Sequence, residues 1–335
     1  MGFWPHSCND ADELCRGNLN EVAVKQPFVI SELNPDEIPE ACELFHRVFG
    51  QAVGPDHWRW KYMQGPRLGC VNVVLRGAGG ELLGHAGASI FPGCLAGATL
   101  SMAQVCDLMI DSSVRGGMEP DSAYQMLFNT LRDRLGARIS EPYGYGFAGI
   151  RPFKLGTRKG FYRELRRHYP GYFSAPKSQR WISGLWTAEE IDWDIRLLDN
   201  VWSRRVPEIR YPIVLRTGSY LGWRYRDHPA NEYRLWLLSH LTRDRGWFIT
   251  RSMPDGEVCI VDALLPESVD PQRQVLALVN ALASTLTSAP PVYAWFLPAR
   301  EGNPAYPVIG GEFSVKQWHT QDPDPKFQPG DTDVY

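Results

Sequence analysis

The chain has 335 residues, of which 44% are hydrophobic and 22% charged, values ordinary for a globular protein with room for two domains. Its net charge of -3 gives no general attraction to nucleic acid or to an anionic membrane, and no segment approaches the length of about 18 apolar residues that indicates a membrane-spanning helix. Seven cysteines without C-x-x-C spacing predict reduced thiols, a cytoplasmic location and no metal site.

The first half of the chain alternates between apolar runs and turn residues. Residues 1–26 lack such a pattern and predict a flexible arm, and a first domain is expected over 27–175. Apolar periodicity and flanking glycines or prolines predict its elements: strands near 27–33, 70–76, 82–90, 100–110 and 143–148, a last strand from Gly160, and helices near 35–49, 120–135 and 151–158, with a short helix ending before Pro66.

The second half repeats this order after a linker near 175–185 that is rich in Pro, Ser and Gly. A second domain is expected over 186–320, and a polar, Pro-rich tail over 321–335 is expected to fray. The predicted elements are a helix near 188–204, strands near 233–241, 246–251 and 257–264, a helix near 270–287 and a strand near 291–297.

One segment occurs twice. Residues 57–66 return as 220–229, and when Trp60 is aligned with Trp223 both copies read Trp, base, Tyr, three variable residues and Pro. A repeat of this period indicates two domains of one ancestry in tandem. The predicted fold class is therefore α+β, with two similar domains that each have a mixed, mostly antiparallel sheet flanked by helices.

A turn with features of an anion site follows the strand near 100–110. It contains Arg115, Gly116 and Gly117 and leads into the start of a helix. Glycines let the backbone approach a ligand, a helix N-terminus favours negative charge, and an arginine adds charge-assisted hydrogen bonds to phosphate. The alternative is a glycine-rich connection with a surface arginine.

This strand, loop and helix, followed by a strand at Tyr143 and by Gly160-Phe161, resemble the GNAT superfamily of acyl-CoA-dependent acyltransferases. In that superfamily the loop after the fourth strand binds the CoA pyrophosphate. The resemblance implies acyl-CoA as co-substrate, held by Leu108, Met109, Ile110, Arg115, Gly116, Gly117 and Met118. The chain departs from the family pattern, since Met118 and Pro120 stand where glycines are usual and Glu119 adds a negative charge.

The second half lacks the same loop chemistry. Its equivalent strand aligns Asp262 with Asp107, but the loop that follows, 266–271, has no glycine, no base and two acidic residues. Such a loop should repel a pyrophosphate. We therefore expect one donor site, in the first half, with the second domain as a scaffold or as a wall of the acceptor pocket.

Acyl transfer to an amine needs a base, donors that polarise the thioester carbonyl, and an acid for the leaving thiolate. By family analogy Asp107 is the candidate base, and the backbone N–H of Met109 lies near the oxyanion position. A structural role for Asp107 is the alternative, favoured by the equivalent Asp262. Tyr143 and Tyr145 are the candidate acids, because the usual Tyr of the following helix is missing.

The expected function is transfer of an acyl group from acyl-CoA to an amine, or a hydroxyl, of a small-molecule acceptor by direct attack. Two alternatives stay open. The altered glycine loop also fits an acyl donor carried on an acyl carrier protein or on aminoacyl-tRNA. The missing Tyr also fits a catalytically silent protein that keeps the fold and binds a ligand. Neither nucleic acid nor a membrane is an expected partner.

Overall fold

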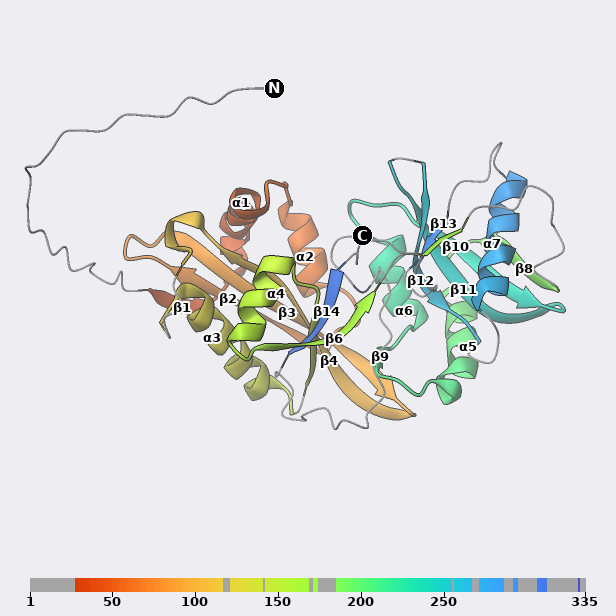
Figure 1. Cartoon of the computed structure of the whole chain (residues 1–335), viewed down its shortest axis with the longest axis horizontal. Helices are drawn as coiled ribbons and strands as arrows, with labels where there is room; N and C mark the ends of the chain where they lie inside the picture. The colour runs from red at the N-terminus through yellow and green to blue at the C-terminus, as the bar shows by residue number, and fades with distance from the viewer. Residues whose placement is uncertain are drawn as a thin grey trace, which may run out of the picture.

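The computed structural model describes residues 28–116, 121–140, 142–168, 171–173, 185–254, 256–266, 271–285, 292–294, 306–311 and 331. Two mixed sheets organise these residues, one in each half of the molecule (Figure 1). All strand pairs are antiparallel except β4 with β5 and β12 with β13, which occupy equivalent places in the two sheets. The predicted α+β fold class, with a mostly antiparallel sheet in each half, is confirmed.

The first sheet has the strand order β1-β2-β3-β4-β5-β14-β6, and β9 pairs with β3 beside it. Its strands are β1 (Val29–Glu32), β2 (Gly69–Arg76), β3 (Leu82–Leu95), β4 (Ala98–Ile110), β5 (Tyr143–Gly146), β6 (Tyr162–His168), β9 (Ile213–Val214) and β14 (Tyr306–Gly311). Long, apolar β3 and β4 form its centre, and both are longer than the strands predicted over 82–90 and 100–110.

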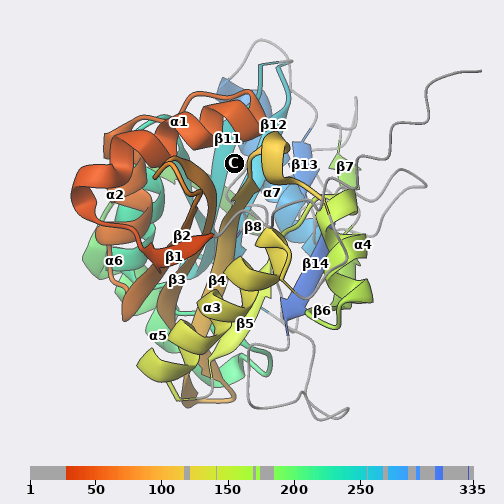
Figure 2. The ribbon, with the colours of Figure 1, turned by 90° about the vertical axis from the view of Figure 1, so that its left-hand side faces the viewer.

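Helices cover both faces of the first sheet (Figure 2). They are η1 (Pro35–Glu37), α1 (Ile38–Phe49), α2 (Pro55–Met63), η2 (Ser112–Val114), α3 (Ala123–Arg138) and α4 (Ile150–Arg158). Leu127 and Leu131 of α3 pack with Val73 of β2, whereas α1 and α2 pack with Val74, the next residue along that strand. The alternation of side chains along β2 thus separates the α3 face from the α1–α2 face.

The second sheet has the order β7-β13-β12-β11-β10-β8. Its strands are β7 (Gly171–Phe173), β8 (Trp186–Ile191), β10 (Arg234–His240), β11 (Arg243–Ser252), β12 (Val258–Leu264) and β13 (Val292–Ala294). The helices of this half are α5 (Ile195–Arg205), η3 (Val206–Glu208), α6 (Gly218–Leu221), the π-helical η4 (Gly222–Arg226) and α7 (Pro271–Thr285). The helix expected near 188–204 is wrong in its first part, because residues 186–191 form the edge strand β8 and α5 begins at Ile195.

Two strands lie in the sheet of the other half. β14, from the C-terminal part of the chain, pairs with β5 and β6 of the first sheet, and it is the blue strand among the green and orange ones in Figure 1. In return β7 pairs with β13 of the second sheet. The expected domain limits of 27–175 and 186–320 therefore do not coincide with the membership of the two sheets.

The repeated segments meet between the halves. The rings of Trp60 in α2 and Trp223 in η4 stack with centroids 5.0 Å apart. Trp60 Nε1 donates to the Trp223 carbonyl at 3.0 Å, and Trp223 Nε1 donates to the Trp60 carbonyl at 3.1 Å. The contact is reciprocal, like that between two copies related by a two-fold axis. The aromatic repeat is thus the packing anchor that joins the halves.

Candidate active site

A bulge in β4 shapes the candidate site. The register of β3 and β4 shifts between His85 and Gly87, and Asp107 has a left-handed φ of 49°. Before the bulge, Ala103 and Val105 pack on the α3 face; after it, Leu108 and Ile110 do so. The extra residue re-aims the strand, as bulges next to functional sites often do. It leaves Asp107 on the side of the sheet that α2 covers.

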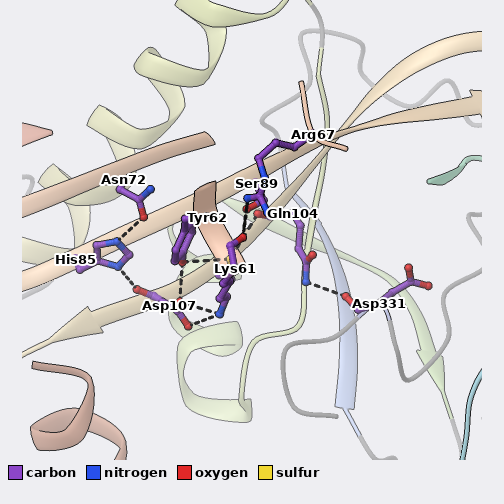
Figure 3. Close-up of polar contacts among 10 residues, drawn as sticks. Lys61, Tyr62, Arg67, Asn72, His85, Ser89, Gln104, Asp107 and Asp331 are labelled. Atoms are coloured by element: carbon purple, nitrogen blue, oxygen red, sulfur yellow. Dashed lines mark hydrogen bonds and ion pairs between the residues drawn. The ribbon is translucent and has the colours of Figure 1, made fainter. Parts of the chain in front are cut away.

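The side chain of Asp107 is buried, and two side chains of α2 contact its carboxylate (Figure 3). Lys61 Nζ lies 2.8 Å from its carboxylate, and the Tyr62 hydroxyl donates to it at 2.6 Å. Burial raises the pKa of Asp107, but the ion pair with Lys61 and the hydrogen bonds from both side chains outweigh it and hold that pKa below its usual value. Asp107 is therefore an ionised, neutralised carboxylate rather than a group with high affinity for a proton.

His85 continues the network behind Asp107. Its Nδ1 lies 2.8 Å from the Asp107 carbonyl oxygen and its Nε2 lies 3.0 Å from the Asn72 amide oxygen. Burial lowers the pKa of His85 to about 4, so the ring is neutral near pH 7 and has only one N–H to donate. That N–H serves the Asp107 carbonyl, and the Asn72 amide can turn to donate to Nε2. His85 thereby helps to fix the bulge.

Glycine at position 87 is required by this packing. A Cβ on Gly87 would overlap the hydroxyl end of the Tyr62 ring. The same hydroxyl lies 3.4 Å from Cys106 Sγ. The Tyr62 ring thus packs against β3 at Gly87, and its hydroxyl reaches Asp107 only because β3 has no side chain at this position.

The first sheet opens next to the bulge. β4 and β5 run parallel and pair from Met102 with Tyr143 to Val105 with Gly146. β5 ends there, but β4 continues to Ile110. The predicted donor-binding residues Leu108, Met109 and Ile110 form this continuation, which is paired with β3 on its other edge. The result is a split between the two strands, where one edge of β4 has no strand partner among the described residues.

The loop after β4 is described as far as Gly116. Asp111 accepts a hydrogen bond from the Ser113 backbone N–H at 3.0 Å and pairs with Arg47. Arg115 is exposed and its Nε donates to the Ile110 carbonyl at 2.7 Å, which places the guanidinium at the end of β4. Gly116 has a φ of 141°. The predicted residues Gly117 and Met118 lie outside the described part of the chain.

The two candidate acids lie on β5, on the side that faces the second half. Tyr145 is 1% exposed and packs in the cluster that contains Trp60 and Trp223, with Tyr143 partly buried beside it. Burial raises the pKa of Tyr145 well above its usual value, so the phenol is protonated at neutral pH. Tyr145 pairs in register with Gln104, three residues before Asp107.

Asp331 of the C-terminal tail also lies in this region, and the sequence did not predict this contact. Asp331 was expected in a frayed tail, but it is 3% exposed, so the expectation is wrong at this residue. Gln104 donates to its carbonyl oxygen at 2.8 Å, and Arg216 Nη2 donates to its carboxylate at 2.6 Å. A buried guanidinium requires anionic partners, and Arg216 supplies the physical reason for this placement. The isolated Asp in a polar tail gave no sequence signal.

The second half repeats the Tyr–Asp pair with another cation. Tyr225, equivalent to Tyr62, donates to Asp262 at 2.8 Å. Here Arg216, not the base next to the Tyr, neutralises the carboxylate at 2.8 Å, and Arg216 also serves Asp331. Burial and the second carboxylate raise the pKa of Asp262 to about 6 despite Arg216. Residues 267–270 of the loop predicted to have lost phosphate binding lie outside the described residues.

Solved structures are similar to this chain in fold. A probable N-acyltransferase from Enterococcus faecalis V583 superposes with a TM-score of 0.61 at 14% identity, covering 85% of this chain and 71% of that one. GCN5-related N-acetyltransferases from Kribbella flavida and Anabaena variabilis ATCC 29413 give TM-scores of 0.58 and 0.59 at 14% identity, covering 86% and 84% of this chain and 71% and 72% of theirs. This chain has the GNAT fold.

The likeness to GNAT proteins is structural only. No protein-family model matches the sequence, and no curated protein matches it. At 14% identity the superpositions establish the fold, and they leave the chemistry to the residues of the site. Within the described residues no helix meets the length and hydropathy of a membrane span, and the cysteines described there are free thiols.

Proposed function

We propose that this protein transfers an acyl group from acyl-CoA to an amine, or to a hydroxyl, of a small-molecule acceptor. The observation that carries the proposal is the split between β4 and β5 next to the β4 bulge, in a chain with the GNAT fold. The split presents backbone N–H groups of one strand edge, which suit the polar backbone of a pantetheine arm and its thioester. The reduced thiols agree with a cytoplasmic enzyme.

We place the donor at the first half. The edge formed by Leu108, Met109 and Ile110 would bind the pantetheine arm, and Arg115 with Gly116 and its neighbours would bind the phosphates. The pairs of β12 with β13 are parallel, like those of β4 with β5, so the pairing itself does not distinguish the halves. The proposal of a single donor site therefore depends on the loops, because only the first has a base and glycines.

In the proposed reaction the acceptor amine attacks the thioester carbonyl, and the thiolate leaves with a proton. Tyr145 and Tyr143 are the candidates to donate that proton, since a buried phenol stays protonated until the thiolate forms. Asp107 stays a candidate base, but its low pKa and its ion pair with Lys61 favour the structural role. In that role it anchors α2 to the β4 bulge and so holds the oxyanion position.

Isothermal titration with acetyl-CoA and longer acyl-CoAs tests the donor. We expect micromolar binding that Arg115→Glu weakens by about tenfold or more, because a charge-assisted phosphate contact becomes a repulsive one. Arg132→Glu is the matched control, since Arg132 is an exposed arginine on α3, outside the loop that contains Arg115. Equal effects of the two changes would refute a phosphate site at Arg115.

Release of free CoA thiol in the presence of a panel of amines tests the transfer itself. Acceptor-dependent release is expected, and Asp107→Asn with near-normal turnover would remove Asp107 from the candidate bases. If no CoA ester binds, the acyl-CoA proposal is wrong, and a donor on an acyl carrier protein or a ligand-binding role without catalysis becomes the next hypothesis to test.

A further inference from the structure

A second concave site lies in the second half, away from the β4–β5 split. A surface pocket of about 460 Å³ opens between the end of α5 and the β10–β11 hairpin. Four arginines and two acidic residues line it: Arg204, Arg205, Arg243, Arg245, Glu208 and Asp244. The lining therefore has an excess of positive charge in a chain whose net charge is negative.

Arg205 is the buried arginine of this lining. It is 8% exposed, and its Nη2 pairs with Glu208. Its Nε is buried and has no hydrogen-bond partner among the residues that the structure describes. An arginine at a helix end complements the helix dipole from an exposed position, so the dipole does not explain a buried, unsatisfied donor. A buried donor of this kind in a pocket lining is rare and calls for an acceptor that the described residues do not supply.

The β10–β11 hairpin carries Arg243 and Arg245. Leu241 and Thr242 form its turn, and both have left-handed φ values, of 51° and 65°, without being glycine. Such residues cost energy and often mark functional positions. Asp244 is held by Ser239 at 3.2 Å, and no ion pair of Arg243 or Arg245 is found in the described part of the chain. Two cationic side chains at the pocket are thus available.

We propose that this pocket binds a small molecule bearing a phosphate or pyrophosphate group. Guanidinium groups present forked donors that match phosphate oxygens, and Arg205 adds a buried guanidinium to the lining. The concave shape fits a small ligand, whereas a nucleic acid would need an extended basic surface. The proposal does not rest on acyl transfer, because no residue of the pocket belongs to the first half.

Titration of the full chain with pyrophosphate and with inorganic phosphate at low ionic strength tests the site. We expect saturable binding of pyrophosphate, weakened about tenfold or more in the Arg243→Gln/Arg245→Gln double variant. Both positions are at least partly exposed, so the double variant should fold. Arg205→Met should weaken binding further. Arg196→Gln, at the other end of α5, is the matched control and should bind as the wild type does.

Three results would overturn the proposal. The first is the absence of saturable binding of either anion. The second is binding that the double variant leaves unchanged but that Arg115→Glu abolishes, since the anion would then occupy the proposed donor site. The third is tighter binding of duplex DNA than of pyrophosphate with the same dependence on Arg243 and Arg245, which would assign the surface to nucleic acid.

Discussion

The reciprocal tryptophan contact allows an asymmetric prediction. In Trp60→Phe, the Trp223 carbonyl loses the N–H that Trp60 donates. In Trp223→Phe, the Trp60 carbonyl loses a similar N–H but keeps Arg67 Nη2, which donates to it at 3.1 Å. The two changes remove the same atoms from the same stacked pair, so their difference isolates the cost of a buried carbonyl without its side-chain donor.

Both substitutions remove buried ring surface, which costs about 1 kcal/mol of folding free energy. A lost hydrogen bond whose acceptor stays satisfied costs about 0.5–1.5 kcal/mol, whereas an acceptor left unsatisfied costs about 1–3 kcal/mol. We therefore expect Trp60→Phe to destabilise the protein by about 2–4 kcal/mol and Trp223→Phe by about 1 kcal/mol less. Both side chains are more than 90% buried, so solvent cannot replace the lost donor.

Urea denaturation followed by far-ultraviolet circular dichroism measures the two losses. Trp58→Phe is the matched control, because Trp58 is 1% exposed in the same helix and its Nε1 has no hydrogen-bond partner among the described residues. This control should lose only the ring surface. The reasoning is wrong if Trp60→Phe is no more destabilising than Trp58→Phe, or if Trp223→Phe is the more damaging of the reciprocal pair.

Two further predictions concern the buried carboxylates. Lys61→Met should destabilise the fold by about 3–5 kcal/mol at pH 7, because it leaves the buried Asp107 carboxylate without its cation. In urea denaturation, the double variant Lys61→Met/Asp107→Asn should recover most of this loss. No recovery would mean that Lys61 stabilises the fold by packing alone. In the folded protein the pKa of Asp262 is raised to about 6. Between about pH 4 and pH 6 the native state therefore binds a proton that the unfolded chain releases. The contribution of Asp262 to the free energy of unfolding falls as the pH rises through this range. Asp331→Asn removes the second carboxylate and should shrink that fall relative to wild type, and an unchanged pH profile would contradict it.

Local patterns predicted most elements within the first half and the core of the second. The strand β8 was missed because Glu189 and Glu190 interrupt its alternation of apolar and polar residues. β8 is an edge strand of its sheet, where charged residues are common. The exchange of β7 and β14 had no local signal. β14 contains Pro307 and two glycines, which disfavour a strand, and it forms through pairs with β5 and β6 that are far away in the sequence.

The site shows the same limit. Asp107 stood out because a repeat and a family resemblance both singled out its strand. Its partners Lys61 and His85 lie 46 and 22 residues away, and sequence alone does not show that α2 would place a lysine against that carboxylate. Asp331 could not be foreseen either, since its burial depends on Arg216, a residue whose own environment is formed only when the two halves are packed together.

Comparison of the halves separates what the fold needs from what the function needs. Tyr62 with Asp107 and Tyr225 with Asp262 keep the same hydrogen bond, although the cation has moved from Lys61 in one half to Arg216 in the other. A feature kept in both copies through such a change is one that either copy requires to fold, so the Tyr–Asp pair is best explained as the clamp between a helix and a bulged strand. We therefore expect the proposed acyl transfer to depend on features that the copies do not share, namely the tyrosines of β5 and the loop at Arg115, and the proposed anion binding to depend on the arginine pocket. Substitutions of exposed residues there, such as Arg115 and Arg243, should change binding or turnover without lowering stability, and substitutions of the clamp should do the reverse.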